Sequence, residues 1–223
     1  MASHFFTSRF GGVSASPYHE NNLATHVGDE LSAVAENRRR LVSMIGNVSF
    51  MNQSHGDTVV LVEDLPRHEP SADAMITQTR GIYLAVLTAD CIPLLLWDDN
   101  SLCVAAVHVG RKGILNDISL KTIDIMRALG SGHIRGVMGP SICGKCYEVG
   151  EDVYQEVVNK FPNAASVTNK GTLSLDLAGA LKELLISYGV EVVRAQSCTV
   201  EDRSLFSYRR DVTTGRFAGI ISL

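Results

Sequence analysis

Three apolar runs in the middle of the sequence constrain the fold more than any other feature. They cover residues 82–87, 93–97 and 102–107, and only short polar segments separate them. Within each run the apolar residues are consecutive, whereas a strand with one solvated face would alternate apolar and polar residues. The runs therefore predict neighbouring strands that are covered on both faces.

Strand-like and helix-like segments are interspersed along the rest of the chain. Further strands are predicted at residues 3–8, 48–52, 58–62, 134–138, 190–198 and 217–222, with a turn at 98–100. Helices are predicted at 30–45, capped by Asp29, and at 115–129, 151–161 and 175–188. This order is typical of an α/β or α+β protein, and no linker or repeat divides residues 1–223, so we expect one domain.

Composition and charge narrow the class of partner. The net charge of -4 and the pI near 6.0 provide no basic footprint for nucleic acid or an anionic membrane. No apolar run approaches the roughly 20 residues that cross a bilayer, and the first residues lack the apolar centre of a signal peptide. The five cysteines are scattered and do not indicate a disulfide framework. We therefore expect a cytoplasmic protein with a small polar ligand.

Three zinc-type ligands, His55, Cys91 and His108, each stand where a strand-like run gives way to a polar turn. Structural zinc sites usually assemble four ligands from close pairs, whereas catalytic sites often take three from separate segments and leave one position open. The wide spacing favours the catalytic kind, in which a neighbouring carboxylate could move protons; Asp90 is adjacent to Cys91. Taken singly, each ligand could also be an ordinary buried cysteine or a hydrogen-bonded histidine.

The same three side chains fit two other enzyme classes. Two histidines and one cysteine also form blue-copper sites, so a copper-dependent polyphenol oxidase is an alternative. A multicopper version would need clustered histidines, and the seven histidines of this chain contain no His-x-His pair. In a third interpretation, His55 or His108 activates Cys91 as the nucleophile of a cysteine hydrolase.

Six short motifs in a fixed order provide a more specific signal. They are SRFGGVS at 8–14, NQSHG at 52–56, TADC at 88–91, AAVHVG at 105–110, GPSI and CYEVG within 139–150, and FSYRRD at 206–211. Together they resemble the polyphenol oxidase laccase domain family, whose members are regarded as purine nucleoside phosphorylases with adenosine deaminase activity. The resemblance runs nearly end to end. It implies a mixed β-sheet sandwich flanked by helices, with His55, Cys91 and His108 as the catalytic zinc ligands.

The resemblance also implies the substrates, which are a purine nucleoside (adenosine, inosine, guanosine or methylthioadenosine) and inorganic phosphate. Phosphate oxygens match the forked donors of guanidinium groups. Arg9, Arg209 and Arg210 lie within the family motifs and are expected to bind substrate, as is Asn22 in the loop after the first motif. By residue type alone, the same arginines could equally form surface ion pairs.

Two segments depart from the family pattern. Where the family usually reads His-Ala-Gly-Trp-Arg-Gly, this chain has Arg111 and Lys112 in place of Trp-Arg. Lysine lacks the guanidinium fork, so the change bears on substrate range, and a metal- or nucleoside-binding protein with weakened catalysis is a further alternative. Cys143 and Cys146 form a C-x-x-C pair where the family commonly has a glycine at the first position, and we interpret the pair as structural or incidental.

Overall fold

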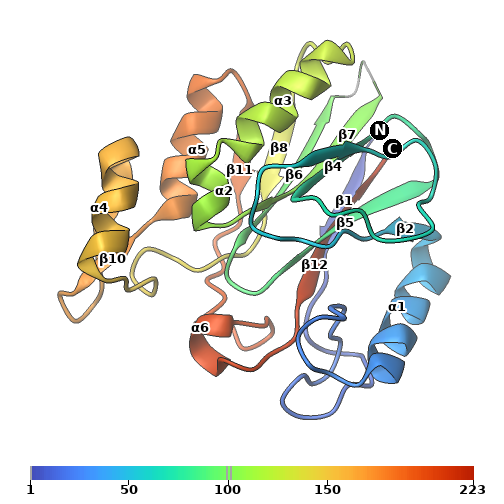
Figure 1. Ribbon diagram of the computed structural model, residues 1–223, viewed down its shortest axis with the longest axis horizontal. Coiled ribbons are helices and arrows are strands. Elements are labelled where there is room, and N and C mark those ends of the chain that lie inside the picture. The colour runs from blue at the N-terminus through green and yellow to red at the C-terminus, as the bar shows by residue number, and fades with distance from the viewer. Residues whose placement is uncertain (1, 99, 101) are drawn as a thin grey trace.

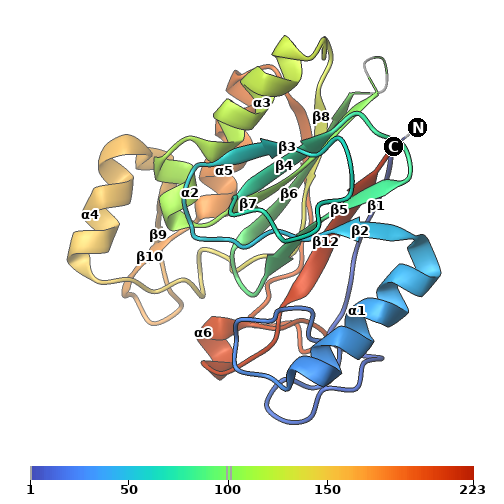
Figure 2. The same ribbon diagram turned by 45° about the vertical axis from the view of Figure 1, so that its right-hand side comes forward.

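Two β-sheets packed face to face form the centre of the computed structural model, which describes residues 2–98, 100 and 102–223 (Figure 1). Helices α2, α3, α4 and α5 lie on the side of the larger sheet, and helix α1 lies against the smaller one, as the turned view also shows (Figure 2). The predicted mixed α/β architecture, a sheet sandwich flanked by helices, is confirmed.

The larger sheet has six strands in the order β11-β8-β6-β7-β4-β3, and the smaller has four in the order β1-β12-β5-β2. Both sheets mix parallel and antiparallel pairs, and β9 and β10 form a separate ribbon. In chain order the strands are β1 Ser3–Phe6, β2 Asn47–Ser49, β3 Val59–Leu61, β4 Ala74–Thr77, β5 Ile82–Thr88, β6 Ile92–Asp98, β7 Cys103–Val109, β8 Arg135–Met138, β9 Ala165–Val167, β10 Leu173–Leu175, β11 Glu191–Arg194 and β12 Phe217–Ser222.

The longer helices bury apolar residues on one face, whereas α6 buries none. In chain order they are α1 Leu31–Ile45, α2 Arg111–Leu115, α3 Ile118–Ala128, α4 Glu151–Lys160, α5 Leu177–Ser187 and α6 Tyr208–Asp211, with a 3₁₀ turn at Pro162–Ala164. The carboxylate of Asp176 caps α5 by accepting the backbone N–H of Gly179 at 3.0 Å. Within the described residues, none of these helices combines the length and apolarity needed to cross a membrane.

Alternate side chains of the central strands reach two different apolar layers. In β6, Leu94 and Leu96 pack in the layer beneath α3 and α5, whereas Leu95 packs between the sheets with Leu84 of β5. Because both directions are apolar, the run is consecutive, as the sequence predicts. All four leucines are fully buried, so truncating Leu95 to alanine should cost about 2–5 kcal/mol.

The prediction of a single helix at 115–129 is wrong in its first turn, because the chain forms two helices there. Asp117 has a left-handed φ of 58° and separates α2 from α3. The ammonium of Lys160 donates to the carbonyl of Leu115 at 2.8 Å and to the carboxylate of Asp117 at 2.7 Å. Lys160 of α4 thus supplies a hydrogen-bond donor for a carbonyl group at the end of α2. The local pattern of apolar residues does not indicate this contact.

Other differences are local. Glu30, not Asp29, is the N-cap residue of α1, and the Asp29 carboxylate instead accepts the side-chain N–H of Asn22 at 2.9 Å. The sequence pattern predicts no strand at β4, because four residues are too few to display a period. The strands predicted at 48–52 and 190–198 end early, at Ser49 and Arg194. Within the predicted turn at 98–100, Asp99 lies outside the described residues.

Candidate metal centre and adjoining cavity

Antiparallel pairing of β6 and β7 brings Cys91 and His108 together. Cys91 immediately precedes β6, and His108 is the second-last residue of β7. The register pairs Ile92 with Val109 and Pro93 with His108, so the start of one strand lies beside the end of the other. The predicted placement of both residues at strand ends is confirmed.

Asp73 joins His55 to this pair. It precedes β4, which pairs antiparallel with β7, so it lies beside His108. Its Oδ1 is 2.8 Å from Nδ1 of His108 and accepts the backbone N–H of His55 at 3.0 Å. Its Oδ2 accepts the backbone N–H of Gly56 at 2.7 Å. One buried carboxylate therefore positions both the ring of His108 and the loop that carries His55.

The three predicted ligands converge on one point. Their ligand atoms all lie within 4.8 Å of one another, and Nε2 of His55 is 3.9 Å from Sγ of Cys91. Imidazole nitrogens and thiolates bind zinc at about 2.0–2.3 Å, so donors sharing a tetrahedral ion lie about 3.5 Å apart. His108 uses Nδ1 for Asp73 and keeps Nε2 for an ion, an arrangement common at zinc sites. The donor set and its spacing therefore fit Zn²⁺.

The electrostatics of the group favour a thiolate at Cys91. Burial raises the pKa of the Cys91 thiol, but His108 and His55 outweigh burial and lower it to about 6. Burial lowers the pKa of His108, whereas Cys91 and Asp73 raise it to about 9. Burial also raises the pKa of Asp73, but hydrogen bonds from His108 and Gly56 lower it to about 2. The thiolate of Cys91 and the carboxylate of Asp73 thus flank His108, and a divalent cation bound there would balance their negative charge.

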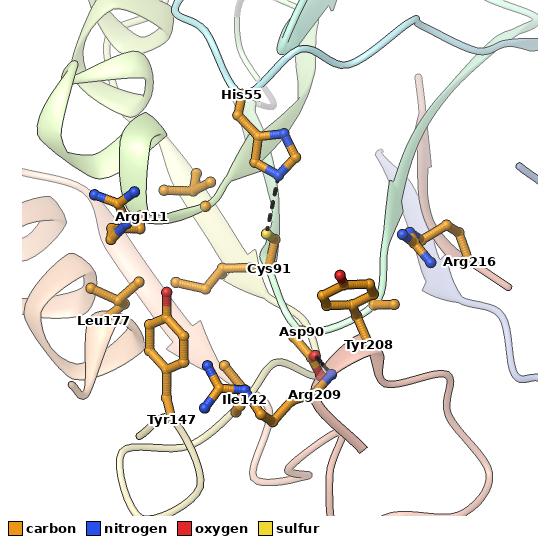
Figure 3. A pocket seen from close by; sticks show the side chains of 14 residues that line it. His55, Asp90, Cys91, Arg111, Ile142, Tyr147, Leu177, Tyr208, Arg209 and Arg216 are labelled. Atoms are coloured by element: carbon orange, nitrogen blue, oxygen red, sulfur yellow. Dashed lines mark hydrogen bonds between the residues drawn. The ribbon is translucent and has the colours of Figure 1, made fainter. Parts of the chain in front are cut away.

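A cavity of about 390 Å³ opens beside Cys91 (Figure 3). Its volume is within the range of small-molecule sites, about 300–1,000 Å³. Figure 3 shows Arg111 and Tyr147 on one side of Cys91, and Tyr208 and Arg216 on the other. Apolar side chains contribute to the remaining wall, namely Ala89, Ile92, Val109, Ile142 and Leu177. A largely apolar wall with a few cations suits a flat ligand that has polar edges.

A smaller cavity of about 250 Å³ adjoins the first. It is lined by His55, Cys91, Arg111 and Tyr147, which also line the larger cavity, and by the exposed Lys112. The segment that departs from the family pattern therefore contributes two cations to the site. The two cavities meet at two of the three candidate metal ligands.

Asp90 lines the larger cavity, but its carboxylate is engaged with a neighbouring loop. Oδ1 accepts the hydroxyls of Thr199 at 2.6 Å and Ser207 at 2.7 Å, and Oδ2 accepts the backbone N–H of Arg209 at 2.6 Å. Its φ of 100° is rare for a residue other than glycine. These bonds make Asp90 an anchor for the loop that carries Arg209. Its role in proton transfer stays a prediction.

Arg209 is the predicted substrate-binding residue that lines the cavity. Its guanidinium donates to the carbonyl of Glu148 at 2.6 Å and lies 5.2 Å from the ring centroid of Tyr147. These contacts hold the cation on the Tyr147 side of the cavity, whereas the backbone of Arg209 bonds Asp90 (Figure 3).

Arg9, Asn22 and Arg210 are not among the residues that line either cavity. Arg9 forms a 3.9 Å ion pair with Asp211, and Arg210 donates to four backbone carbonyls of the preceding loop. Asn22 is fully buried, and its Oδ1 accepts the backbone N–H of Arg216 at 2.9 Å. All three hold backbone segments behind the wall, and their direct contact with substrate stays a prediction.

Sequence reasoning does not single out Asp73, Tyr208 or Arg216. Asp73 carries a usable signal, because a lone carboxylate between Ala72 and Ala74 in an apolar stretch needs a polar partner once it is buried. Tyr208 lies inside the FSYRRD motif, but the two arginines of that motif are the more obvious candidates for binding an anionic substrate. Arg216 stands just before the last strand, where nothing in the sequence distinguishes it from a surface arginine.

Comparison with known proteins identifies the family of this chain. A family model described as multi-copper polyphenol oxidoreductase laccase matches residues 3–223. A purine nucleoside phosphorylase of Corynebacterium glutamicum is 44% identical over 228 residues, covering 98% of this chain and 93% of that protein. One from Streptomyces coelicolor is 45% identical over 233 residues, covering 99% and 96%.

Solved structures show the same fold. A crystal structure of a Neisseria meningitidis protein matches with a TM-score of 0.91 at 35% identity, covering 100% of this chain and 94% of that one. The YfiH protein of Bacillus licheniformis matches with a TM-score of 0.91 at 27% identity, covering 100% and 92%. The resemblance drawn from the six motifs is confirmed, and this chain belongs to the multi-copper polyphenol oxidoreductase laccase family, in which its relatives carry the name purine nucleoside phosphorylase.

Proposed function

We propose that this chain is a zinc-dependent purine nucleoside phosphorylase that cleaves adenosine, inosine, guanosine or methylthioadenosine with inorganic phosphate, and that it also deaminates adenosine. The observation that carries the proposal is the convergence of His55, Cys91 and His108 beside a cavity large enough for a nucleoside. The names of the relatives from Corynebacterium and Streptomyces support the phosphorylase activity.

His55, Cys91 and His108 would hold Zn²⁺, with Asp73 fixing the orientation of the His108 ring. Three protein ligands leave a position for water or substrate. A bound Zn²⁺ supplies a Lewis acid and makes a water-derived nucleophile available near neutral pH. Deamination of adenosine needs such a nucleophile at the ring carbon that carries the amino group.

Phosphate would bind in the smaller cavity, beside Arg111 and Lys112. Arg111 is held in place by an ion pair with Glu156, and its forked donors match phosphate oxygens. Lys112 adds a second positive charge from an exposed side chain. An anion in this cavity would lie next to Cys91 and thus close to the reacting atoms of a bound nucleoside.

The nucleoside would bind in the larger cavity. Tyr208 is 56% exposed, and its ring offers a face on which a purine can stack. Arg216 and Arg209 lie at the same cavity, and burial lowers the pKa of Arg216. Negative charge develops on the purine as its bond to the sugar breaks, and a guanidinium donor there stabilises that charge.

Two other functions that these side chains could serve are less well supported. A multicopper oxidase needs clustered histidines, whereas the second group of metal-binding side chains found in the described residues consists of cysteines. A cysteine hydrolase needs Cys91 free, but His55 and His108 surround the thiolate as a ligand set would.

Product analysis with metal-quantified protein tests the proposal. Zinc-loaded protein is incubated with adenosine or inosine, with and without phosphate, and bases, nucleosides and ribose phosphate are separated by chromatography. We expect phosphate-dependent release of adenine or hypoxanthine, and phosphate-independent conversion of adenosine to inosine, with neither product from Cys91→Ala. Fully zinc-loaded protein that forms no product would contradict the proposal, as would activity that requires copper or that persists in metal-free protein.

Paired variants test where each substrate binds. Lys112→Met should raise KM for phosphate on the order of tenfold and leave KM for the nucleoside unchanged, because a charged hydrogen bond contributes about 1.5–3 kcal/mol. Tyr208→Ala should do the reverse, because it removes the stacking face. Lys182→Met, an exposed change on α5, is the matched control for Lys112. Exchanged KM effects would overturn the assignment of the two cavities.

A further inference from the structure

A second group of metal-binding side chains lies apart from the first. The sulfur atoms of Cys143, Cys146 and Cys198 all lie within 4.8 Å of one another, and all three are free thiols. The C-x-x-C pair thus acquires a third thiol from a segment more than 50 residues further along the chain. None of the three lines the cavity beside Cys91.

Glu201 lies beside Cys146, at the edge of the group that the three sulfur atoms form. Its Oε1 lies 3.7 Å from Sγ of Cys146. Thiolate sulfur and carboxylate oxygen bind zinc at about 2.3 and 2.1 Å, so in a tetrahedral site the two atoms lie about 3.6 Å apart. The observed separation therefore suits two ligands of one ion. The three sulfur atoms converge without Glu201, whose carboxylate would turn towards them to complete the four-ligand set that is usual for structural zinc.

The local backbone presents the thiols together. The backbone N–H of Cys146 donates to the carbonyl of Cys143 at 3.0 Å, which closes a tight turn between the two cysteines. The backbone N–H of Cys143 lies 3.4 Å from Sγ of Cys198. Cys198 is buried, whereas Cys143 and Cys146 are half-buried and leave an ion a path from solvent.

We propose that Cys143, Cys146, Cys198 and Glu201 bind a second Zn²⁺, a structural ion that is separate from the one at His55. Each thiol releases its proton to solvent when the ion binds. Soft thiolate ligands select zinc over magnesium or calcium, which prefer oxygen. The proposal does not depend on the catalytic activity, because its ligands differ from those of the first site.

The ion would fix one wall of the substrate cavity. A parallel bridge between Ser141 and Cys198 already aligns the two segments. One segment continues to Tyr147, which lines the cavity, and the other to Thr199, whose hydroxyl bonds Asp90. A metal ion that links the two segments would restrain both Tyr147 and the hydrogen bond between Thr199 and Asp90. Loss of the ion should therefore increase amide hydrogen exchange in residues 198–209.

Zinc stoichiometry tests the proposal. The protein is stripped with chelator under reducing conditions, reloaded with Zn²⁺, desalted and measured for zinc per chain. We expect two zinc ions in the wild type, one in Cys91→Ala, one in Cys143→Ser and none in the double variant. Cys103→Ala removes a buried thiol outside both groups and should keep two. A Cys91→Ala protein that binds no zinc would overturn the proposal, whereas one that binds zinc but has no activity leaves it intact.

Cobalt spectroscopy identifies the ligands. Co²⁺ in Cys91→Ala should show intense sulfur-to-metal charge-transfer bands, which are lost in Cys91→Ala with Cys143→Ser. Glu201→Gln keeps every thiol, and we expect it to weaken cobalt binding on the order of tenfold. If mass spectrometry instead finds a disulfide among the three cysteines, and the reduced protein takes up no cobalt, the proposal is wrong.

Discussion

Oδ1 of Asp73 lies 2.8 Å from Nδ1 of His108 and also accepts the backbone N–H of His55. The carboxylate is buried, and any other position of the side chain would break these hydrogen bonds. It therefore couples the end of β7 to the loop before β3, and the orientation of two candidate ligands depends on one side chain.

Replacing Asp73 with asparagine should weaken zinc binding by about 10–100-fold, because the partner that orients the His108 ring loses its charge. The amide would also place N–H groups against backbone donors that now bond the carboxylate. Competition with a chromogenic chelator measures the affinity. Asp57→Asn, which removes an exposed carboxylate paired with Lys121, is the control and should bind zinc normally. Equal affinities for the wild type and Asp73→Asn would show that the contact does not tune the site.

The stability of the metal-free protein should depend on Asp73 at acidic pH. Hydrogen bonds hold the pKa of this carboxyl at about 2, below its ordinary value of 3.8. Such a group stabilises the folded state above the ordinary pKa and loses that contribution as the pH falls towards 2. Urea unfolding should show a difference on the order of 2 kcal/mol between the wild type and Asp73→Asn at pH 6, shrinking below pH 4. A difference that does not vary with pH would point to packing instead.

Cys91 should react as a thiolate in metal-free protein. His108 and His55 lower its pKa to about 6 against burial, so its alkylation rate should rise with pH through about 6 and then level off. Burial raises the pKa of Cys103 to about 11, which makes that thiol the unreactive internal control. Peptide mass spectrometry after iodoacetamide treatment reports both sites. Bound zinc should protect Cys91, and equal labelling with and without zinc would mean that the thiol is not a ligand.

Gly110 should tolerate no side chain without disturbing the metal site. A Cβ at this position would lie 3.0 Å from Sγ of Cys91 and 3.2 Å from Cδ2 of His55. We expect Gly110→Ala to fold and to bind zinc about tenfold more weakly, comparable to losing a hydrogen-bond partner of a ligand. Gly132→Ala is the matched control, because no atom lies within 4 Å of its added Cβ. Unchanged zinc affinity in Gly110→Ala would mean that the two ligands can move apart freely.

Asp90→Asn distinguishes an anchor from a proton carrier. Asparagine keeps an acceptor for Thr199 and Ser207, but it turns an N–H group towards the backbone donor of Arg209. As an anchor, Asp90 should affect KM for the nucleoside several-fold and leave the shape of the pH–rate profile unchanged. Loss of one limb of that profile, together with a large fall in kcat, would assign proton transfer to Asp90.

The central strands were predictable because their burial is encoded locally. Residues 93–97 lie between two apolar layers, so every position of the run had to be apolar. The missed β4 and the break between α2 and α3 depend on partners elsewhere, such as Lys160 binding the end of α2. The hydrophobic periodicity of a segment contains no information about contacts with residues that are remote in the chain.

The sequence by itself determined the kinds of chemistry available, because the residue types and ordered motifs name the ligands His55, Cys91 and His108 without any coordinates. Only the tertiary structure decided which groups meet. The β6–β7 register places Cys91 beside His108, and Asp73 adds the loop of His55. The same folding moves Arg9, Asn22 and Arg210 behind the cavity and brings Cys198 to the C-x-x-C pair. Convergence of distant side chains depends on strand register and loop anchoring, which arise from long-range packing and hydrogen bonds.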